Sequence, residues 1–393
     1  MSEPAGAQAR DPLRVHVLID TLGAGGAEFL LADFAAVAPD VGIDVTVAAL
    51  KPLSGPVPAA ERLRRGGVEP DAVPVTSMVR PRSLRLVRAH LARVRPDLLH
   101  THLGTADFLG GAAARTLQIP CVSTIHADWF GESRADRARA WLAARARRQC
   151  ADLVIAVSDS SRRAYLAEGL DRPDHVTVVR NGIAERARPG SGAAVREQLG
   201  LAAGDLVITA VSALRPEKNF ETAIDAVGLL RDRFPNARLV IAGDGPHAEA
   251  VRVHAAGRER VILAGHREDV MELLDATDVL VHPSRFDAFP TTLLEAMAAS
   301  VPIVATAVGG MLEIVEPETS GILVPPPPTA RAFADALTPL LEDVALRRRL
   351  AAGGRARFER EFGALPWLRR LRATYDGVLN ARGAATRRGR RRR

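Results

Sequence analysis

Short apolar runs alternate with longer stretches rich in Ala, Leu and Arg, and this alternation restricts the fold more than any other feature. The runs lack the polar alternation of a strand with one face in water, so they indicate strands buried on both faces. The expected strands are Val15–Ile19, Val45–Ala49, Leu98–His100, Cys121–Thr124, Leu153–Val157, Val176–Val179, Leu206–Val211, Arg238–Ala242, Val261–Ala264, Val279–His282, Ile303–Ala305 and Gly321–Val324. The intervening stretches are typical of helices, among them Phe220–Phe234, Asp269–Ala276 and Pro290–Ala299. Strand and helix in alternation predict parallel, doubly wound α/β sheets.

The strand series restarts near residue 205, and 393 residues suit two domains. We expect a disordered N-terminus over 1–12, an N-terminal Rossmann-like domain over 13–185 and a linker over 186–204. A C-terminal Rossmann-like domain over 205–365, a C-terminal helix over 366–383 and a basic tail over 384–393 follow. Two facing sheets of this kind leave a cleft at the carboxyl ends of their strands, where ligands bind.

Composition narrows the function classes. The formal net charge is +7, and six of the positive charges are arginines of the tail Arg387–Arg393, which leaves a body near +1. We expect the tail to be a solvated arm, with contact to an anionic membrane or to nucleic acid as the alternatives, and we expect no nucleic-acid binding by the body. Two cysteines, no visible signal peptide and no apolar run of about 20 residues predict a cytoplasmic protein, peripheral at the inner membrane face if the tail binds lipid.

The first strand runs into a glycine-rich turn that contains Gly25 and Gly26 and precedes a helix. Such a turn lets backbone N–H groups approach an anion, although a plain structural turn is the alternative. Glu28 stands where the dinucleotide motif G-x-G-x-x-G needs its third glycine, which argues against NAD.

Histidines follow two N-terminal strands, and a histidine at a sheet rim can donate a hydrogen bond or titrate near neutrality. His126 has the better position for a functional role, whereas His102 is more simply a satisfied loop residue. No cluster of histidines and cysteines has zinc spacing.

The strand Leu206–Val211 ends in a loop with two cations, Arg215 and Lys218, before a helix. A point charge, a guanidinium fork and a helix N-terminus together could hold a diphosphate, although a solvated loop is the alternative. The Gly243–Pro246 turn after the next strand keeps backbone close to the same edge.

The segment 283–298 is the most specific indication of function in the sequence. Asp287 and Glu295 lie eight residues apart around a helix start at Pro290, so N–H groups from about Phe289 to Thr292 are free of helical partners. Glu295 faces the same side as Thr291 and Thr292. This arrangement can hold a sugar, a phosphate and a ribose, and two solvated acids at a helix start are the alternative.

The string from Asp287 to Glu295 resembles the E-x7-E element of glycosyltransferase family 4, nucleotide-sugar-dependent enzymes with the GT-B fold. The resemblance covers about Val15 to Asp376. Further segments in family-like order are Gly25–Glu28, Asn181–Ile183, Gly243–Pro246, Gly265–His266, Asp278–Leu280, and Gly309–Gly310 with Glu313.

The resemblance implies retaining transfer of a sugar from a nucleoside-diphosphate sugar to a glycan, lipid or small-molecule acceptor, as in polysaccharide or glycolipid biosynthesis. It assigns the donor mainly to the C-terminal domain and makes His126, Lys218 and Asp287 catalytic. The implied donor-binding residues are Gly25, Gly26, Arg215, Lys218, Gly243, His266, Arg267, Asp287, Ala288, Phe289, Thr291, Thr292 and Glu295.

No Asp-x-Asp motif is present, so we expect no metal and no cofactor besides the donor substrate. Two positions depart from the family pattern: Ala213 replaces an arginine that binds diphosphate, and Asp287 is one methylene shorter than glutamate. A degenerate scaffold protein of a glycan-assembly complex, or another GT-B enzyme such as an epimerase or phosphorylase, therefore stays open.

Overall fold

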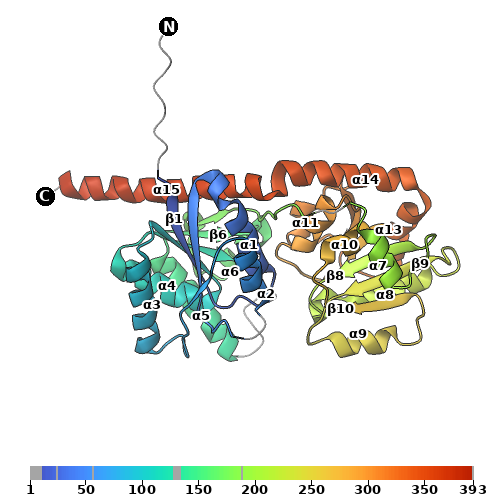
Figure 1. The fold of residues 1–393 in the computed structure, drawn as a ribbon, viewed down its shortest axis with the longest axis horizontal. Coiled ribbons are helices and arrows are strands. Elements are labelled where there is room, and N and C mark those ends of the chain that lie inside the picture. Colours follow the sequence, from blue (N-terminus) through green and yellow to red (C-terminus); the bar gives the residue numbers. More distant parts are fainter. Residues whose placement is uncertain (1–10, 24, 55–56, 127–133, 187–188, 392–393) are drawn as a thin grey trace, which may run out of the picture. The chain divides into compact units, whose positions relative to one another are not determined.

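The computed structural model describes residues 11–23, 25–54, 57–126, 134–186 and 189–391, and the chain divides into two compact units (Figure 1). Unit 1 comprises Met1–Ala156, Tyr165–Val179 and Leu368–Arg393. Unit 2 comprises Val157–Ala164 and Arg180–Trp367. Each unit contains one parallel sheet with helices around it.

Unit 1 has a seven-stranded sheet in the order β3-β2-β1-β4-β5-β6-β7. Its strands are β1 (Leu13–Ile19), β2 (Ile43–Ala49), β3 (Asp71–Ala72), β4 (Leu98–His102), β5 (Cys121–Ile125), β6 (Leu153–Ala156) and β7 (Val176–Val178). Its helices are α1 (Gly26–Val37), η1 (Ala38–Val41), α2 (Pro58–Arg65), α3 (Pro81–Val94), α4 (Gly104–Leu117), α5 (Arg134–Cys150) and η2 (Pro173–His175). Two helices are divided between the units, α6 (Asp159–Ala167) and α15 (Ala364–Arg391).

Unit 2 has a six-stranded sheet in the order β10-β9-β8-β11-β12-β13. Its strands are β8 (Leu206–Val211), β9 (Ala237–Ala242), β10 (Val261–Gly265), β11 (Val279–His282), β12 (Ile303–Thr306) and β13 (Gly321–Val324). Its helices are α7 (Gly192–Gln198), η3 (Pro216–Lys218), α8 (Phe220–Leu229), α9 (Ala248–Ala255), α10 (Val270–Asp275), α11 (Thr291–Ala298), α12 (Met311–Ile314), α13 (Ala330–Glu342), α14 (Val344–Arg357) and the π-helical η4 (Phe358–Phe362).

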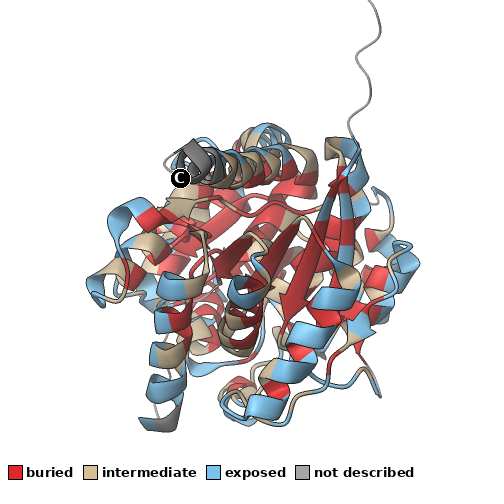
Figure 2. Cartoon of the chain, turned by 90° about the vertical axis from the view of Figure 1, so that its left-hand side faces the viewer, coloured by how far each residue is buried: buried red, intermediate tan, exposed pale blue. Residues whose placement is uncertain are grey.

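The predicted fold class is confirmed: both sheets are parallel, doubly wound and Rossmann-like, and every predicted strand is present. The inner strands are buried on both faces, as their apolar composition predicts, and Figure 2 shows these buried strands between helices with exposed outer faces. The two-residue strand β3 was not predicted, because Asp71 and Ala72 carry no strand pattern.

The expected linker over 186–204 differs from the structure, because helix α7 lies within it and packs against α10. Gly192 permits this close approach, since a Cβ there would lie 2.6 Å from the backbone nitrogen of Ala276. Asp275 accepts a 2.7 Å hydrogen bond from the Gly192 N–H. The segment is therefore part of the fold of unit 2.

The C-terminal helix also differs from its expected boundaries of 366–383. Helix α15 continues to Arg391 through the expected tail, and from Leu368 onward it belongs to unit 1. Leu368, Leu371, Tyr375 and Val378 form a buried stripe at helical spacing, which explains this docking. The expected disordered N-terminus lies outside the described residues except for residues 11–12.

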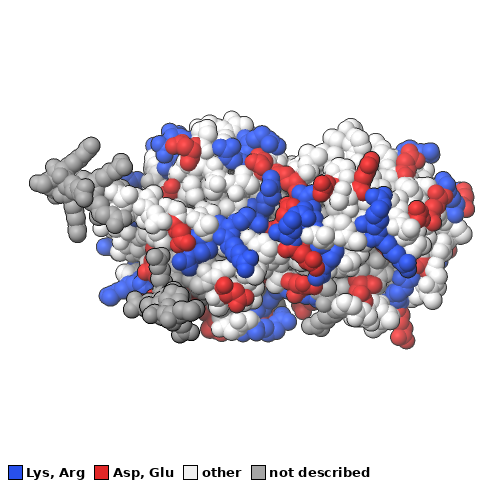
Figure 3. Space-filling view, turned by 90° about the horizontal axis from the view of Figure 1, so that it is seen from above, with Lys and Arg blue, Asp and Glu red and all other residues white. Residues whose placement is uncertain are grey.

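Charge is mixed on the face seen in Figure 3, where basic and acidic side chains lie interspersed. This mixture agrees with the small net charge of the body. Among the described residues, no helix combines the length and apolar character that spanning a membrane requires.

We predict that His16 makes unit 1 sensitive to acid. Burial lowers the pKa of His16 to about 3, and the Nε2 atom of His90 lies 3.0 Å from that of His16. Because the unfolded chain takes up a proton near pH 6.5 and the folded chain does not, this stabilisation is present above pH 6.5 and is lost as the pH falls toward 3. The melting temperature of His16→Gln should therefore drop less between pH 7.5 and pH 5 than that of the wild type. If the melting temperatures of the wild type and of His16→Gln dropped equally, His16 would not be a source of the acid sensitivity.

Candidate functional site

The strand order brings two candidate loops of unit 2 together. Strands β8 and β11 are hydrogen-bonded neighbours, and the chain leaves them in opposite directions across the sheet. The loops at their carboxyl ends, 212–219 and 283–290, therefore flank the point where the strand order reverses, which is where open α/β sheets bind ligands.

Three contacts connect these two loops. The Asn219 side chain donates a 3.2 Å hydrogen bond to the Pro283 carbonyl. The Arg285 N–H donates a 2.8 Å bond to the Glu217 carbonyl. The Lys218 ammonium forms a short ion pair with the Asp287 carboxylate, so the first acid of the expected motif lies beside the expected phosphate cation.

Asp287 is held in its ionised form. His282, the last residue of β11, lies with its Nε2 atom 3.1 Å from Oδ2 of Asp287 and 3.0 Å from the Ser284 hydroxyl oxygen. Burial favours the neutral acid, but the hydrogen bond to His282 and the charge of Lys218 outweigh it and lower the pKa of Asp287 to about 2. The Asp287 and Lys218 side chains are only 14% and 16% exposed, so little water screens this pair.

Free backbone donors follow Asp287. Ala288 and Phe289 are buried, and within the described residues their N–H groups donate no hydrogen bond. Helix α11 begins directly afterwards at Thr291, and its N-terminus adds positive potential. Thr291 and Thr292 lie in the first turn and Glu295 lies one turn further along, so the expected donor residues share one helix.

Glycines allow neighbouring backbone segments to pack closely against both loops. Gly310 donates a 3.0 Å hydrogen bond to the Asp287 carbonyl, and a Cβ on Gly309 would lie 2.1 Å from that oxygen. A Cβ on Gly243 would lie 1.9 Å from the Ser212 carbonyl. Gly243 therefore packs against the cation-bearing loop.

The remaining expected donor residues of unit 2 differ in their environment. Arg215 is exposed and forms no ion pair within the described residues, and Ala213 beside it is also exposed. His266 is exposed beyond β10. The Arg267 guanidinium is held by Asp269 at 2.9 Å and by Gln198 at 2.9 Å, which leaves its backbone for a ligand.

In unit 1, Gly25 is the N-cap of helix α1 and Gly26 is its first residue. A Cβ on Gly25 would lie 2.0 Å from a carboxylate oxygen of Glu28. The carboxylate of Glu28 thus covers Gly25 at this helix start, and an anionic ligand there would meet a negative charge.

Four ring groups form two hydrogen-bonded pairs near the carboxyl ends of β4 and β5. Nδ1 of His102 lies 2.7 Å from Nε2 of His126, and Nδ1 of His100 lies 2.7 Å from the Tyr375 hydroxyl. Burial lowers the pKa of His100 to about 3, that of His126 to about 4 and that of His102 well below its usual value. The three histidines are therefore neutral near pH 7.

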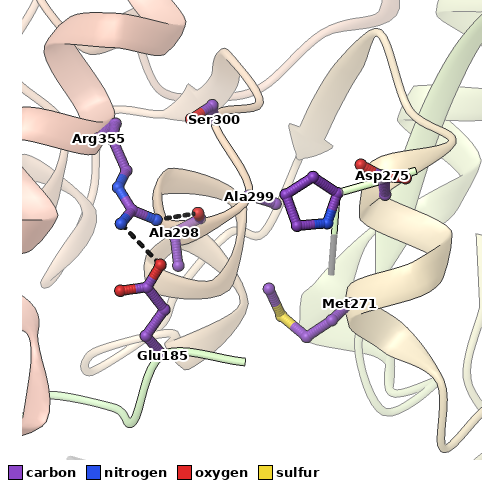
Figure 4. A pocket seen from close by; sticks show the side chains of 8 residues that line it. Glu185, Met271, Asp275, Ala298, Ala299, Ser300 and Arg355 are labelled. Carbon is purple, nitrogen blue, oxygen red and sulfur yellow. Dashed lines mark hydrogen bonds and ion pairs between the residues drawn. The ribbon is translucent and has the colours of Figure 1, made fainter. Parts of the chain in front are cut away.

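Unit 2 also has a cavity of about 300 Å³ (Figure 4). It lies near the amino ends of the strands, because Asp275 precedes β11 and Ser300 precedes β12. Arg355 contributes to its wall, paired with Glu185 and bonded to the Ala298 carbonyl. None of the expected donor residues lines it. Within the described part of the chain, no group of three or more His, Cys, Asp or Glu side chains could hold a metal ion.

Sequence reasoning missed the contact of His282 with Asp287 and that of His102 with His126. In the sequence, His282 is the last residue of a strand that is otherwise apolar. Its position five residues before Asp287 was the only indication of a contact. His102 and His126 are far apart in sequence, and only the pairing of β4 with β5 brings them together.

Comparisons with known proteins show which family the chain resembles. Residues 24–186 match the model "Glycosyltransferase Family 4" and residues 193–357 match "Glycosyl transferases group 1". An alpha-D-kanosaminyltransferase of Streptomyces kanamyceticus is 30% identical over 68% of this chain and 75% of its own length. A UDP-Gal:alpha-D-GlcNAc-diphosphoundecaprenol alpha-1,3-galactosyltransferase of Escherichia coli is 28% identical over 60% of this chain.

The fold is shared with solved GT-B glycosyltransferases. HepE of Anabaena, solved with UDP-glucose, superposes with a TM-score of 0.81 at 22% identity over 93% of this chain and all of the other. The chain spans 64% of the length of the Escherichia coli galactosyltransferase and 66% of that of a Mycobacterium tuberculosis glycogen synthase, to which it is 31% identical.

We predict that Gly309→Ala destabilises unit 2 and Gly228→Ala does not. Gly309 has φ +56° and no room for a Cβ, whereas a Cβ on Gly228 in α8 meets no atom within 4 Å. A clash with the Asp287 carbonyl should lower the melting temperature. Alanine at the exposed position 228 should leave the melting temperature unchanged or raise it, with a gain in unfolding free energy of up to about 0.5–1 kcal/mol. Equal melting temperatures for the two variants would contradict the support that Gly309 gives to Asp287.

Proposed function

Because the chain belongs to glycosyltransferase family 4, we propose that it is a retaining glycosyltransferase that uses a nucleoside-diphosphate sugar and no metal ion. The acceptor is a glycan, a lipid or a small molecule, in polysaccharide or glycolipid assembly in the cytoplasm. The observation that carries the proposal is the partly buried Lys218 beside free N–H groups at the start of α11.

Sugar transfer requires that the negative charge on the leaving diphosphate be stabilised. As the bond between the sugar C1 and the diphosphate oxygen breaks, the oxygen keeps the electron pair and the sugar becomes oxocarbenium-like. Lys218 and the N–H groups of Ala288 and Phe289 stabilise the developing negative charge, because preorganised donors act strongly where water is excluded. The acceptor oxygen then bonds to C1, and its proton passes to the diphosphate.

The other residues hold the donor. Glu295 binds the ribose hydroxyls, Asp287 contacts the sugar hydroxyls, and the backbone of His266 and Arg267 holds the base. Arg215 supplies the second cation that Ala213 lacks, since its guanidinium has no carboxylate partner within the described residues. His126 contacts the transferred sugar. The structures of HepE with UDP and with UDP-glucose support a uridine nucleotide as the first donor to test.

We predict that nucleoside diphosphates raise the melting temperature and that this shift depends on Lys218 and Glu295. Loss of one charged hydrogen bond costs about 1.5–3 kcal/mol, so the double variant Lys218→Met with Asp287→Asn, which removes both charges together, should weaken binding at least tenfold. Glu295→Ala should abolish the shift. Arg331→Ala, an exposed cation paired with Asp335, serves as the control and should bind like the wild type. If no nucleotide of any base shifts the wild type, the donor site is wrongly assigned.

We also predict that EDTA leaves the transfer rate unchanged and that the product keeps the anomeric configuration of the donor. The first outcome follows from charge stabilisation by Lys218 and amide groups, and the second from the family. The rate is measured as nucleoside diphosphate released with an acceptor pool, and the configuration by NMR of the product. Activity that disappears with EDTA and returns with Mg²⁺, or an inverted anomer, would overturn the respective part of the proposal.

A further inference from the structure

His102 and His126 meet because of the register of their strands. In the pairing of β4 with β5, His102 lies opposite Thr124, and His126 follows two residues later. Side chains two residues apart on extended chain share a face, so His126 lies on the side of the sheet occupied by Thr124. The bond of 2.7 Å between His102 Nδ1 and His126 Nε2 is at the short end of the normal range.

A bond between two neutral imidazoles needs one N–H and one lone pair. Both rings are neutral near pH 7, because burial lowers the pKa of each. Either the His102 N–H donates and Nε2 of His126 accepts, or the direction is reversed. The direction of this hydrogen bond also determines whether the other nitrogen of each ring is protonated, since a neutral imidazole carries one N–H proton.

The second nitrogen of His102 decides between these directions. Nε2 of His102 is fully buried and has no hydrogen-bond partner within the described residues. If His126 donated, this atom would be a buried N–H without a partner. If His102 donates, it is an unused lone pair. Among backbone groups, buried N–H donors without a partner are rarer than unpaired acceptors, and the same preference makes the His102 N–H the donor.

We infer that His102 is a positioning residue that donates its Nδ1–H to Nε2 of His126 and thereby makes His126 present a protonated Nδ1 to the transferred sugar. The part of this inference that concerns the sugar rests on the proposed function, whereas the direction of the hydrogen bond is independent of it. Protonated Nδ1 is a donor, so it suits a sugar hydroxyl oxygen. His126 is only partly buried, and its Nδ1 makes no hydrogen bond within the described residues.

Two variants separate positioning from structural support. His102→Leu removes the hydrogen bond and also the unpaired Nε2, so the fold should melt at or near the wild-type temperature while kcat falls. The expected fall is about 10- to 100-fold, by analogy with the range seen when groups that orient a metal-binding histidine are removed. His102→Asn places an amide N–H at the position of Nδ1 and should recover most of the kcat that leucine loses.

The protonation state is read directly from the histidine ¹⁵N chemical shifts of the labelled protein, with His126→Ala to assign the signals. We expect Nδ1 of His126 to be protonated and Nε2 to be bare in the wild type, and this preference to be lost in His102→Leu. A protonated Nε2 in the wild type would overturn the inference, as would a wild-type kcat in His102→Leu. A kcat that falls only together with the melting temperature would show structural support instead. A wild type that transfers no sugar from any donor refutes the proposed function, and the ¹⁵N shifts still decide the hydrogen bond.

Discussion

Each sheet adds strands in both directions from its first strand, and this topological constraint determines where the chemistry of the chain gathers. The chain turns one way after β8 and the other way after β11, so their loops separate at the carboxyl edge of the sheet. Lys218 and Asp287 meet there although they are 69 residues apart. The same reversal between β1 and β4 places the glycine turn and the histidines at the corresponding edge of unit 1.

The Lys218–Asp287 pair lies partly buried at this edge of unit 2. Removing two charges from water is costly, and the pair offsets this cost only because further groups satisfy it. His282 and Ser284 provide those groups on one side, and Gly309–Gly310 support the backbone on the other. Under the proposed function, a bound diphosphate would compete with Asp287 for the same ammonium, so Asp287 would limit how tightly Lys218 holds the leaving group.

Local pattern was enough to predict the strands other than β3, the two sheets and the loops that carry Lys218 and Asp287, because strands buried on both faces appear in the sequence as apolar runs. Contacts between distant residues were not accessible in this way. His282 contacts Asp287 only because the loop after β11 folds back onto the end of that strand. Tyr375 contacts His100 only because α15 packs on unit 1. The segment expected to be a linker contains α7, a glycine- and alanine-rich helix whose partners come from α10 and from strands β8 and β9.

The two units carry different chemistry at the carboxyl edges of their sheets. A nucleoside-diphosphate sugar has a charged diphosphate and an uncharged sugar that becomes cation-like as its bond breaks. Unit 2 places the ammonium of Lys218 near the N-terminus of α11, and both suit a diphosphate. Unit 1 offers histidines that burial keeps neutral, with the pKa of His126 at about 4. A protonated imidazole beside an oxocarbenium-like carbon would oppose its formation, whereas a neutral ring oriented by His102 can bind a hydroxyl without that penalty.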